Sequence, residues 1–363
     1  MKRIDIFIVN FFSATDSAGA IASLGANSLW DFWVIDNSDD PIAWSNLVDA
    51  IAATAVSVHL VKAPKNIGFG NACNALYRQT NCDYCLLLNP DARIDAPALL
   101  ALYKQLEAEN KFAALAPMMR WDKDEDWWIP TVPPQTILHQ IYQSIIALHP
   151  QLLKTAWMHY HRQQCGLLDH TGIMKQSFLS GAILLLRRSA VEDINSHALQ
   201  LFDPNYFMFF EDADLSRRLR RSGYLLGIST QVHGSHLYRH STGKYQLIQD
   251  SFELYEACHE PHWLLRLKSW WLRKIQPYHR CLQPNRLDAG LSSLDLLNSA
   301  LGQRTLIAWS PAPSRMPAIW RKHALNTTQG FSNEAWGRLC LGHYYGVAQD
   351  KQGRLSWIEF DRQ

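Results

Sequence analysis

The sequence has little that would tie it to a nucleic acid or carry it across a membrane. Its formal net charge is only +2, from 35 Lys and Arg residues against 33 Asp and Glu residues. Nucleic-acid binding needs a basic field that this balance does not supply, so we expect no nucleic-acid partner. No stretch approaches the ~20 consecutive apolar residues of a membrane-spanning helix. We therefore expect a globular protein that does not span a membrane.

Cysteine is scarce, and its spacing fits neither a zinc site nor a disulfide framework. The seven cysteines are an odd and scattered set. Cys82 and Cys85 form a CxxC pair with no second pair nearby, and we interpret both as reduced thiols of the core. Residues 1–9 resemble a weak signal peptide, but Asp5 interrupts a short apolar run. A buried first strand and a cytoplasmic protein are expected instead.

Short apolar runs alternate with helix-like segments through much of the chain. This alternation predicts an α/β fold with a doubly wound, mostly parallel sheet. Ligands of such sheets bind beyond the carboxyl ends of the strands, and the polar clusters follow the predicted strands. The strands are expected at residues 4–9, 32–35, 56–61, 84–88 and 180–188, the helices at 71–79, 97–110 and 207–221, and the polar clusters at Asn10, 36–38, 66–70 and 89–91.

Two segments depart from this alternation. Residues 121–176 are too long for an ordinary connection, which predicts an insertion with helices of its own. Its Trp127 and Trp128 suit stacking on the sugar rings of an acceptor, and a plain hydrophobic subdomain is an equal alternative. Residues 261–363 form a C-terminal extension, and no function is predicted for residues 283–363.

The extension begins with Arg and Lys interleaved among Trp and Leu at residues 261–275. That composition suits a helix lying on an anionic membrane surface. The alternative is a helix that packs its tryptophans against the rest of the protein and exposes its basic residues.

Carboxylates cluster at two places. Asp91 follows an apolar strand and Asn89-Pro90, where it could hold a divalent cation between two phosphates; such a sequence is also an ordinary turn. Glu211, Asp212 and Asp214 begin a helix, where the helix dipole alone would favour acids. Phenylalanines 207, 209 and 210 would surround these acids with apolar surface and raise a carboxyl pKa toward the range of a general base.

The segment 66–71 contains two glycines but lacks the Lys-Ser/Thr of a P-loop and the third glycine of a dinucleotide fingerprint. Its glycines allow a close approach of the backbone to a ligand, and the following helix offers free N–H groups. A tight turn without a ligand is the other interpretation.

Six motifs in this order resemble glycosyltransferase family 2, in particular its bacterial rhamnosyltransferase-like branch. They lie at residues 8–10, 34–38, 66–70, 87–92, 180–182 and 210–215. The resemblance implies a GT-A fold in which residues 1–120 bind a nucleotide sugar and residues 177–260 form the acceptor and catalytic half.

The resemblance also implies roles for individual residues. Asp36, with Asn10 beside it, matches the nucleobase contact, and Asp212 matches the catalytic base of a Glu-Asp motif that includes Glu211. Asp91 is the main ligand of Mg²⁺ or Mn²⁺, because the family's Asp-x-Asp motif begins here with Asn89. His233 is the preferred second ligand, His236 the alternative, and His240 lies behind them. The remaining donor contacts are Asn66, Gly68, Phe69, Gly70 and Gly181, and Asp214 is a candidate acceptor contact.

The implied reaction is an inverting transfer in which Asp212 takes the proton of an acceptor hydroxyl. We expect dTDP-rhamnose as donor, with UDP- or GDP-sugars as alternatives, and a surface-glycan or lipid-linked acceptor. A sugar nucleotidyltransferase would need a Gly-rich basic loop that residues 10–15 lack, and a carbohydrate-binding protein would not need both acid clusters. Contact with the inner face of the bacterial membrane and the oligomeric state stay open.

Overall fold

The computed structural model describes most of the chain in two compact units. Unit 1 comprises Met1–Met119, His170–Leu237 and Lys244–Cys258, and unit 2 comprises Arg120–Asp169, Tyr238–Gly243 and His259–Gln363. The described residues are 2–121, 127–131, 136–146, 150–195, 199–237, 245–279, 287–291, 306–310, 318–322, 336, 339, 342–349 and 355–362.

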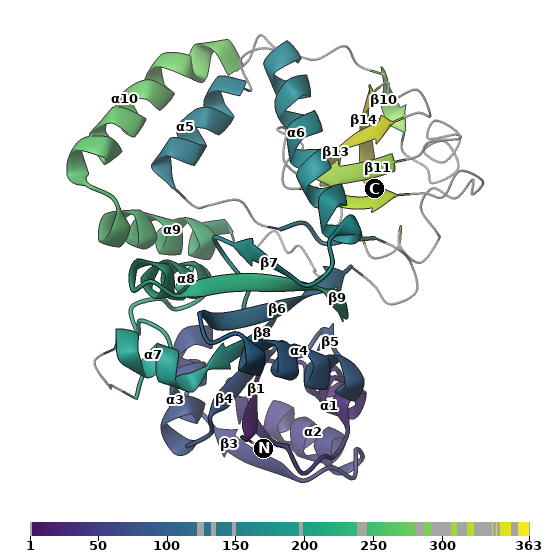
Figure 1. The fold of residues 1–363 in the computed structure, drawn as a ribbon, viewed down its shortest axis with the longest axis vertical. Coiled ribbons are helices and arrows are strands. Elements are labelled where there is room, and N and C mark those ends of the chain that lie inside the picture. The colour runs from purple at the N-terminus through teal and green to yellow at the C-terminus, as the bar shows by residue number, and fades with distance from the viewer. Residues whose placement is uncertain are drawn as a thin grey trace. The chain divides into compact units, whose positions relative to one another are not determined.

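Among these residues, unit 1 contains a nine-stranded sheet of order β3-β2-β1-β4-β8-β6-β9-β5, and β7 pairs with β9 (Figure 1). The strands from β3 to β4 pair in parallel, whereas β4 with β8, β8 with β6, β9 with β5 and β9 with β7 pair antiparallel. The predicted fold class is confirmed. The strands are β1 (Ile4–Asn10), β2 (Trp30–Asp36), β3 (Val58–Lys62), β4 (Tyr84–Leu88), β5 (Ala92–Arg93), β6 (Phe112–Arg120), β7 (Ile173–Gln176), β8 (Ile183–Arg187) and β9 (Leu225–His236).

Helices cover both faces of this sheet because successive side chains of a strand point to opposite sides. Ile6 of β1 packs in a core shared with α1 (Ala14–Leu24), α2 (Pro41–Ala52) and α4 (Ala96–Ala108). The next residue, Phe7, packs in a second core on the other face. That core is shared with α3 (Phe69–Gln79), α7 (Arg188–Ile194) and α8 (Glu211–Arg221). The sheet is therefore doubly wound.

Local sequence sets the helix ends. Asp40 and Asp95 each accept a hydrogen bond from the backbone three residues later, at 2.7 and 2.8 Å, and so cap the starts of α2 and α4. Gly223, with φ of +90°, follows α8 where a left-handed residue ends a helix. The sequence predicted this end of α8. A further helix of unit 1, α9 (Tyr245–His259), packs against the turn that precedes α8.

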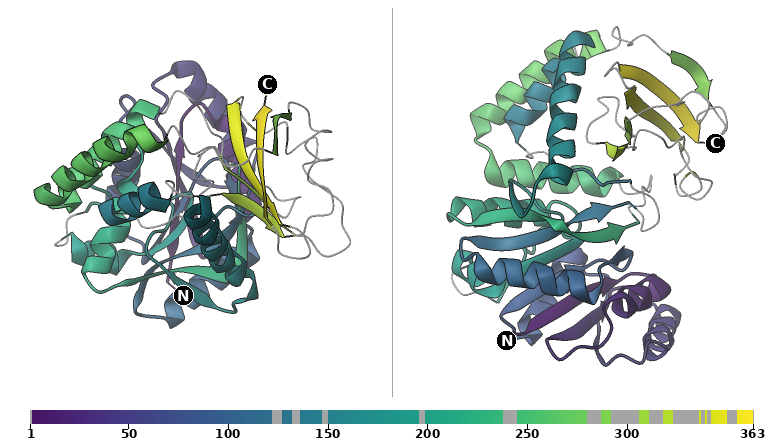
Figure 2. Two further views of the ribbon diagram at one scale, coloured as in Figure 1. Left: turned by 90° about the horizontal axis from the view of Figure 1, so that it is seen from above. Right: turned by 45° about the vertical axis from the view of Figure 1, so that its right-hand side comes forward.

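Unit 2 combines helices with a separate sheet. Its helices are α5 (Ile137–Ile146), α6 (Pro150–Asp169) and α10 (His262–His279). In the described part of the chain, the sheet has five strands in the order β10-β14-β13-β11-β12, and Figure 2 shows the longest of them in yellow. They are β10 (Leu287–Leu291), β11 (Leu306–Ser310), β12 (Ile319–Lys322), β13 (Gly342–Gln349) and β14 (Leu355–Arg362).

Residues 283–363, for which no function was predicted, thus supply the sheet of unit 2. Within the part of the chain that the structure describes, no helix combines the length and apolar character needed to cross a bilayer.

Candidate active site

The carboxyl ends of β1 and β2 meet at a buried polar pair. Asn10 lies opposite Asp36 in the parallel register, and its Nδ2 donates to Asp36 Oδ1 at 2.9 Å. Ser38 Oγ donates to the same oxygen at 2.7 Å. Asp36 is only 1% exposed, yet its Oδ2 accepts no hydrogen bond from the described residues. Since leaving a buried acceptor unsatisfied costs about 1–3 kcal/mol, this oxygen is suited to a donor group on a ligand.

Asn37 ties the glycine loop at residues 66–70 to the end of β2. Its Nδ2 donates to Asn66 Oδ1 at 3.0 Å, and its Oδ1 accepts from the Ile67 N–H at 2.9 Å. Asn66 Oδ1 also accepts from the Gly68 N–H at 3.0 Å. Asn37 was not among the predicted site residues, although its place directly after Asp36 was a usable signal.

The same loop is fixed to the segment that precedes α8. The Phe69 N–H donates to the Phe207 carbonyl at 2.9 Å. Gly68 has φ of +82°, and a Cβ at this position would lie 2.2 Å from that carbonyl oxygen. Only glycine fits here. A Cβ at Gly70 would lie 3.7 Å from the Cβ of Glu211, so the loop reaches the first residue of α8.

The turn before α8 has an unusual backbone. Phe209 and Phe210 both adopt left-handed conformations, with φ of +71° and +63°. A non-glycine residue in this conformation costs about 1–3 kcal/mol of backbone strain, and it persists where the surrounding structure holds it in place. Here α9 supplies that support, because Phe210 packs on Phe252, with ring centroids 5.2 Å apart, and Ser251 Oγ donates to the Met208 carbonyl at 2.7 Å.

This turn presents Asp212 to the glycine loop. Asp212 is half-buried, and its two oxygens accept from the Gly181 N–H at 3.0 Å and the Ala213 N–H at 2.8 Å. A Cβ at Gly181 would lie 3.8 Å from both the Asp212 Cβ and the Phe69 ring. The structure therefore brings together Gly181, the loop and the acid cluster, as the sequence predicted for one site.

The two neighbouring acids differ in acidity. Burial raises the pKa of Asp212 to about 6, although its two backbone N–H donors lower it. Burial, and then the charge of Asp212, raise the pKa of Glu211 to about 8. At neutral pH Asp212 is thus a carboxylate, while Glu211 keeps its proton. The pKa of Asp212 lies in the range that suits a general base.

Asp91 faces a histidine at the other end of the site. His236 Nε2 lies 3.2 Å from Asp91 Oδ1, because the two-residue strand β5 sets Ala92 opposite His236. His233 is exposed on β9, and an odd spacing of three residues places it on the opposite face of the strand. The structure brings His236, and not the preferred His233, to Asp91. His240 lies outside the described residues.

Asp91 and His236 offer a cation one carboxylate oxygen and one imidazole nitrogen. This donor set suits Mn²⁺, whereas Mg²⁺ favours oxygen ligands. Among the described residues no group of three His, Cys, Asp or Glu side chains is arranged to hold a metal ion. The pair would hold a divalent cation only together with further ligands from water or a bound molecule. Asn89 precedes Asp91 by two residues, and its N–H donates to the Ala182 carbonyl at 2.9 Å, next to Gly181.

The three residues predicted as acceptor contacts, Asp214, Trp127 and Trp128, are buried. Asp214 is 3% exposed, and Arg218 Nε donates to its carboxylate at 2.7 Å. Trp127 is fully buried in the core of unit 2, and Trp128, which is 6% exposed, pairs through its backbone with Trp320. A buried indole has no free face for a sugar ring. The plain hydrophobic subdomain, left open by the sequence, is the interpretation that fits these tryptophans.

Two exposed aromatic residues beside Asn10 were missed. Phe11 and Phe12 are 50% and 62% exposed, and their rings meet edge to face at 4.9 Å. Phe12 has φ of +51°, and its N–H donates to Ser38 Oγ at 2.9 Å. Consecutive phenylalanines in a polar turn after a strand were the available signal. The Phe12 backbone is thus linked through Ser38 Oγ to the Asp36 carboxylate.

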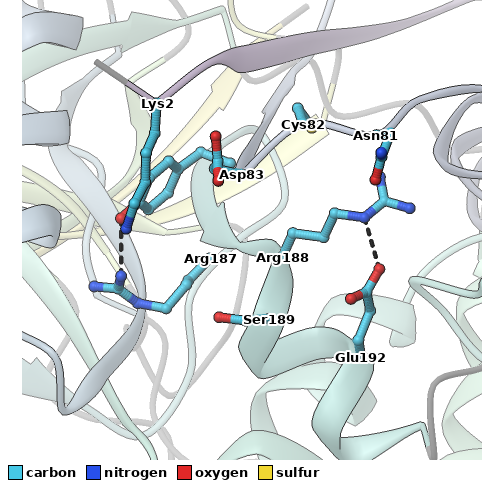
Figure 3. A pocket seen from close by; sticks show the side chains of 9 residues that line it. Lys2, Asn81, Cys82, Asp83, Arg187, Arg188, Ser189 and Glu192 are labelled. Carbon is cyan, nitrogen blue, oxygen red and sulfur yellow. Dashed lines mark hydrogen bonds and ion pairs between the residues drawn. The ribbon is translucent and has the colours of Figure 1, made fainter.

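A separate cavity of about 340 Å³ lies at the other end of the sheet, where β1 and β4 begin (Figure 3). Lys2, Asp83 and Arg188 are among its lining residues. In Figure 3, Arg188 turns to Glu192, with Nε and the carboxylate 2.7 Å apart. Ligands of doubly wound sheets bind at the opposite, carboxyl end, so this cavity is not the candidate site.

Comparisons with known proteins show the family of the chain. The family model described as "Glycosyl transferase family 2" matches residues 5–194. An N-acetylglucosaminyl-diphospho-decaprenol L-rhamnosyltransferase, found in two strains of Mycobacterium tuberculosis, is 26% identical over 199 residues. That match covers 52% of this chain and 61% of the relative, so the chain spans less than two thirds of the relative's length.

The fold is also similar to that of a solved structure, GalNAc-T7 with UDP, GalNAc and Mn²⁺. The TM-score is 0.50 at 10% identity, with 78% of this chain and 52% of that chain covered. At this identity the likeness concerns the fold alone.

Proposed function

Because the chain belongs to glycosyl transferase family 2, we propose that it transfers a sugar from a nucleotide-sugar donor to an acceptor hydroxyl with inversion at the anomeric carbon. The observation that carries this proposal is the position of Asp212 beside Gly181, which also lies against the Phe69 ring of the glycine loop. A carboxylate with a pKa of about 6 at the carboxyl edge of the sheet is equipped to activate a hydroxyl group.

In the proposed reaction, Asp212 accepts the proton of the acceptor hydroxyl. The acceptor oxygen then attacks the anomeric carbon from the side opposite the diphosphate, and the bond from that carbon to the diphosphate oxygen breaks. The electron pair leaves with the nucleoside diphosphate. The N–H groups of Gly181 and Ala213 orient the carboxylate, and the neutral Glu211 avoids a second negative charge beside it.

The pattern around Asp36 supports a pyrimidine donor. Its Oδ1 already accepts from Asn10 and Ser38, so only Oδ2 remains for the base. Thymine and uracil offer one imide N–H at that edge, whereas guanine offers two N–H groups. The rings of Phe11 and Phe12 suit contact with the base. The relative from Mycobacterium tuberculosis is named as an L-rhamnosyltransferase, and dTDP-rhamnose is the donor we propose, with UDP-sugars second and GDP-sugars third.

Asp91 and His236 would hold the divalent cation of this reaction, Mn²⁺ or Mg²⁺. When bound, such a cation stabilises the charge that develops on the leaving diphosphate. Mn²⁺ was present in the similar GalNAc-T7 structure.

The acceptor we propose is a lipid-linked glycan of a bacterial cell envelope, reached at the inner face of the membrane. This proposal is supported by the name of the relative, which specifies a diphospho-decaprenol acceptor. It is also compatible with the basic, tryptophan-rich sequence of α10.

A donor panel tests the proposal. Incubation with dTDP-rhamnose, UDP-sugars or GDP-sugars and Mn²⁺ or Mg²⁺ should release nucleoside diphosphate from one donor. Asp212→Asn should lower turnover roughly 10²–10⁴-fold and keep donor affinity, measured by calorimetry. The control is Asp49→Asn, an exposed acid on α2. Release of pyrophosphate, or normal turnover by Asp212→Asn, would contradict the proposal.

A further inference from the structure

One face of α10 exposes large apolar side chains to solvent. Trp263, Leu267 and Trp270 are 67%, 42% and 51% exposed. Their spacing of four and then three residues puts them in one stripe along the helix. Leu264 and Trp271 mark the side of α10 that packs inward. Leu264 is 7% exposed, and Trp271 Nε1 donates to Ser144 Oγ of α5 at 2.8 Å.

The neighbouring helix α5 has a second stripe of the same kind. Leu138, Tyr142 and Ile145 are 67%, 46% and 39% exposed, with the same spacing. The two helices contact each other within unit 2, and Figure 1 draws them side by side. Single exposed apolar residues are ordinary on a protein surface, but a concentration of them marks an interaction surface.

The charges of this helix pair are of one sign. The sequence of α10 contains Arg266, Lys268, Arg273 and Lys274 and no acidic residue, and α5 contains neither Asp, Glu, Lys nor Arg. Arg266 and Arg273 are exposed. Successive residues are turned by about 100° around a helix axis, which places both arginines next to Trp270 on one side of the stripe. A cationic border along a tryptophan and leucine stripe complements an anionic lipid surface.

We infer that α10, together with α5, docks on the surface of an anionic phospholipid bilayer. Trp263, Leu267 and Trp270 insert among the headgroups, and Arg266 and Arg273 lie at the lipid phosphates. The occupant of this surface is the bilayer itself. The inference goes beyond the proposed transfer reaction, and its test requires neither donor nor acceptor. A negative result for the transfer reaction therefore does not contradict membrane docking, and a negative result for docking does not contradict the transfer reaction.

Flotation of the whole chain with vesicles provides the test. We expect binding to vesicles of phosphatidylglycerol and phosphatidylcholine, weaker binding to phosphatidylcholine alone, and loss of the difference at high salt. The triple variant Trp263→Ser, Leu267→Ser, Trp270→Ser should lose binding. The matched control Ile42→Ser, Leu199→Ser changes exposed apolar residues of unit 1, 71% and 49% exposed, and should bind as the wild type does.

A charge variant keeps the test independent of folding defects in the triple variant. Arg266→Gln, Arg273→Gln should weaken partition into anionic vesicles roughly thirtyfold, since each cation near such a surface contributes about a fivefold factor. Arg78→Gln, Lys111→Gln, at exposed positions of unit 1, is the control. Donor binding and circular dichroism report whether each variant is folded.

Three outcomes would overturn the inference. The first is equal vesicle binding by the wild type and the charge variant. The second is the absence of vesicle binding at low salt. The third is a dimer in sedimentation experiments that the triple variant converts to a monomer without any vesicle binding, since a second copy of the chain would then cover the stripe.

Discussion

Two adjacent carboxyl groups at the start of α8 carry different charges at neutral pH. Burial raises the pKa of Asp212 to about 6, against about 3.9 for an ordinary aspartate. A base must be unprotonated, so kcat/KM should fall as the pH drops through about 6, whereas an exposed aspartate would stay active to about pH 4. The pH profile at saturating acceptor and varied donor measures this limb.

Glu211 supplies the control for that profile. Its pKa of about 8 keeps it protonated throughout the acidic limb, and glutamine imitates the protonated form. Glu211→Gln should therefore leave the limb near pH 6 and remove any change of rate near pH 8. A limb that moves to pH 4 in Glu211→Gln would show that Glu211, and not Asp212, titrates there.

Asp36 allows a second prediction for a single residue. Asn10 and Ser38 both donate to its Oδ1, so in Asp36→Asn the amide oxygen must stay there and the NH₂ group must replace Oδ2. A donor would then face the donor group of the base. We expect affinity for dTDP or UDP to fall roughly 10–100-fold, the factor for a lost buried acceptor.

Calorimetric titration with dTDP, UDP and GDP measures this change. Asp40→Asn is the matched control, because Asp40 caps α2 and asparagine caps a helix about as well as aspartate, so affinity for the nucleotides should stay at the wild-type value. Unchanged affinity for all three nucleotides in Asp36→Asn would remove Asp36 from the donor site.

At the scale of elements, α9 holds the strained turn that presents Asp212. Ser251→Ala removes the hydrogen bond to the Met208 carbonyl, next to the two left-handed phenylalanines. A looser turn should lower kcat about tenfold, near the factor for one lost hydrogen bond, with KM for the donor and the acidic limb of the pH profile unchanged.

Ser269→Ala is the control for this variant, since Ser269 also donates to a backbone carbonyl, at 3.0 Å, on α10. Steady-state kinetics of both variants decide the matter. An equal loss of kcat in the two variants, or a rise in KM for the donor alone, would contradict a positioning role of Ser251.

The sequence predicted those elements whose signal is local. The β4 strand was predicted at its observed bounds, because a continuous apolar run ends there in Asn89-Pro90. The end of α8 at Gly223 was equally local. Pairings between distant strands were not predictable: β5 has only two residues, yet its register with β9 decides that His236 rather than His233 meets Asp91. Such contacts depend on chain segments far apart in sequence.

At the scale of the molecule, the second unit shows the same limit. Its tryptophans are visible in the sequence, but their burial depends on strands from residue 306 onward, as in the contact between Trp121 and Trp309, with ring centroids 5.2 Å apart. The hydrophobic pattern of those strands is too weak to predict the sheet from the sequence. The candidate site in unit 1 follows from local motifs, whereas the core of unit 2 comes from long-range packing.

The docking surface and the transfer site together predict how the whole molecule treats a lipid-linked acceptor. Binding to the bilayer confines the enzyme to the surface that holds such an acceptor, which raises its effective concentration there. The variant Trp263→Ser, Leu267→Ser, Trp270→Ser should therefore lower transfer to an acceptor embedded in anionic vesicles about 10²-fold, while transfer to a short water-soluble acceptor stays at the wild-type rate. The control Ile42→Ser, Leu199→Ser should keep both rates. Equal losses with the two acceptors would mean that the stripe supports the site itself and not its delivery to lipid.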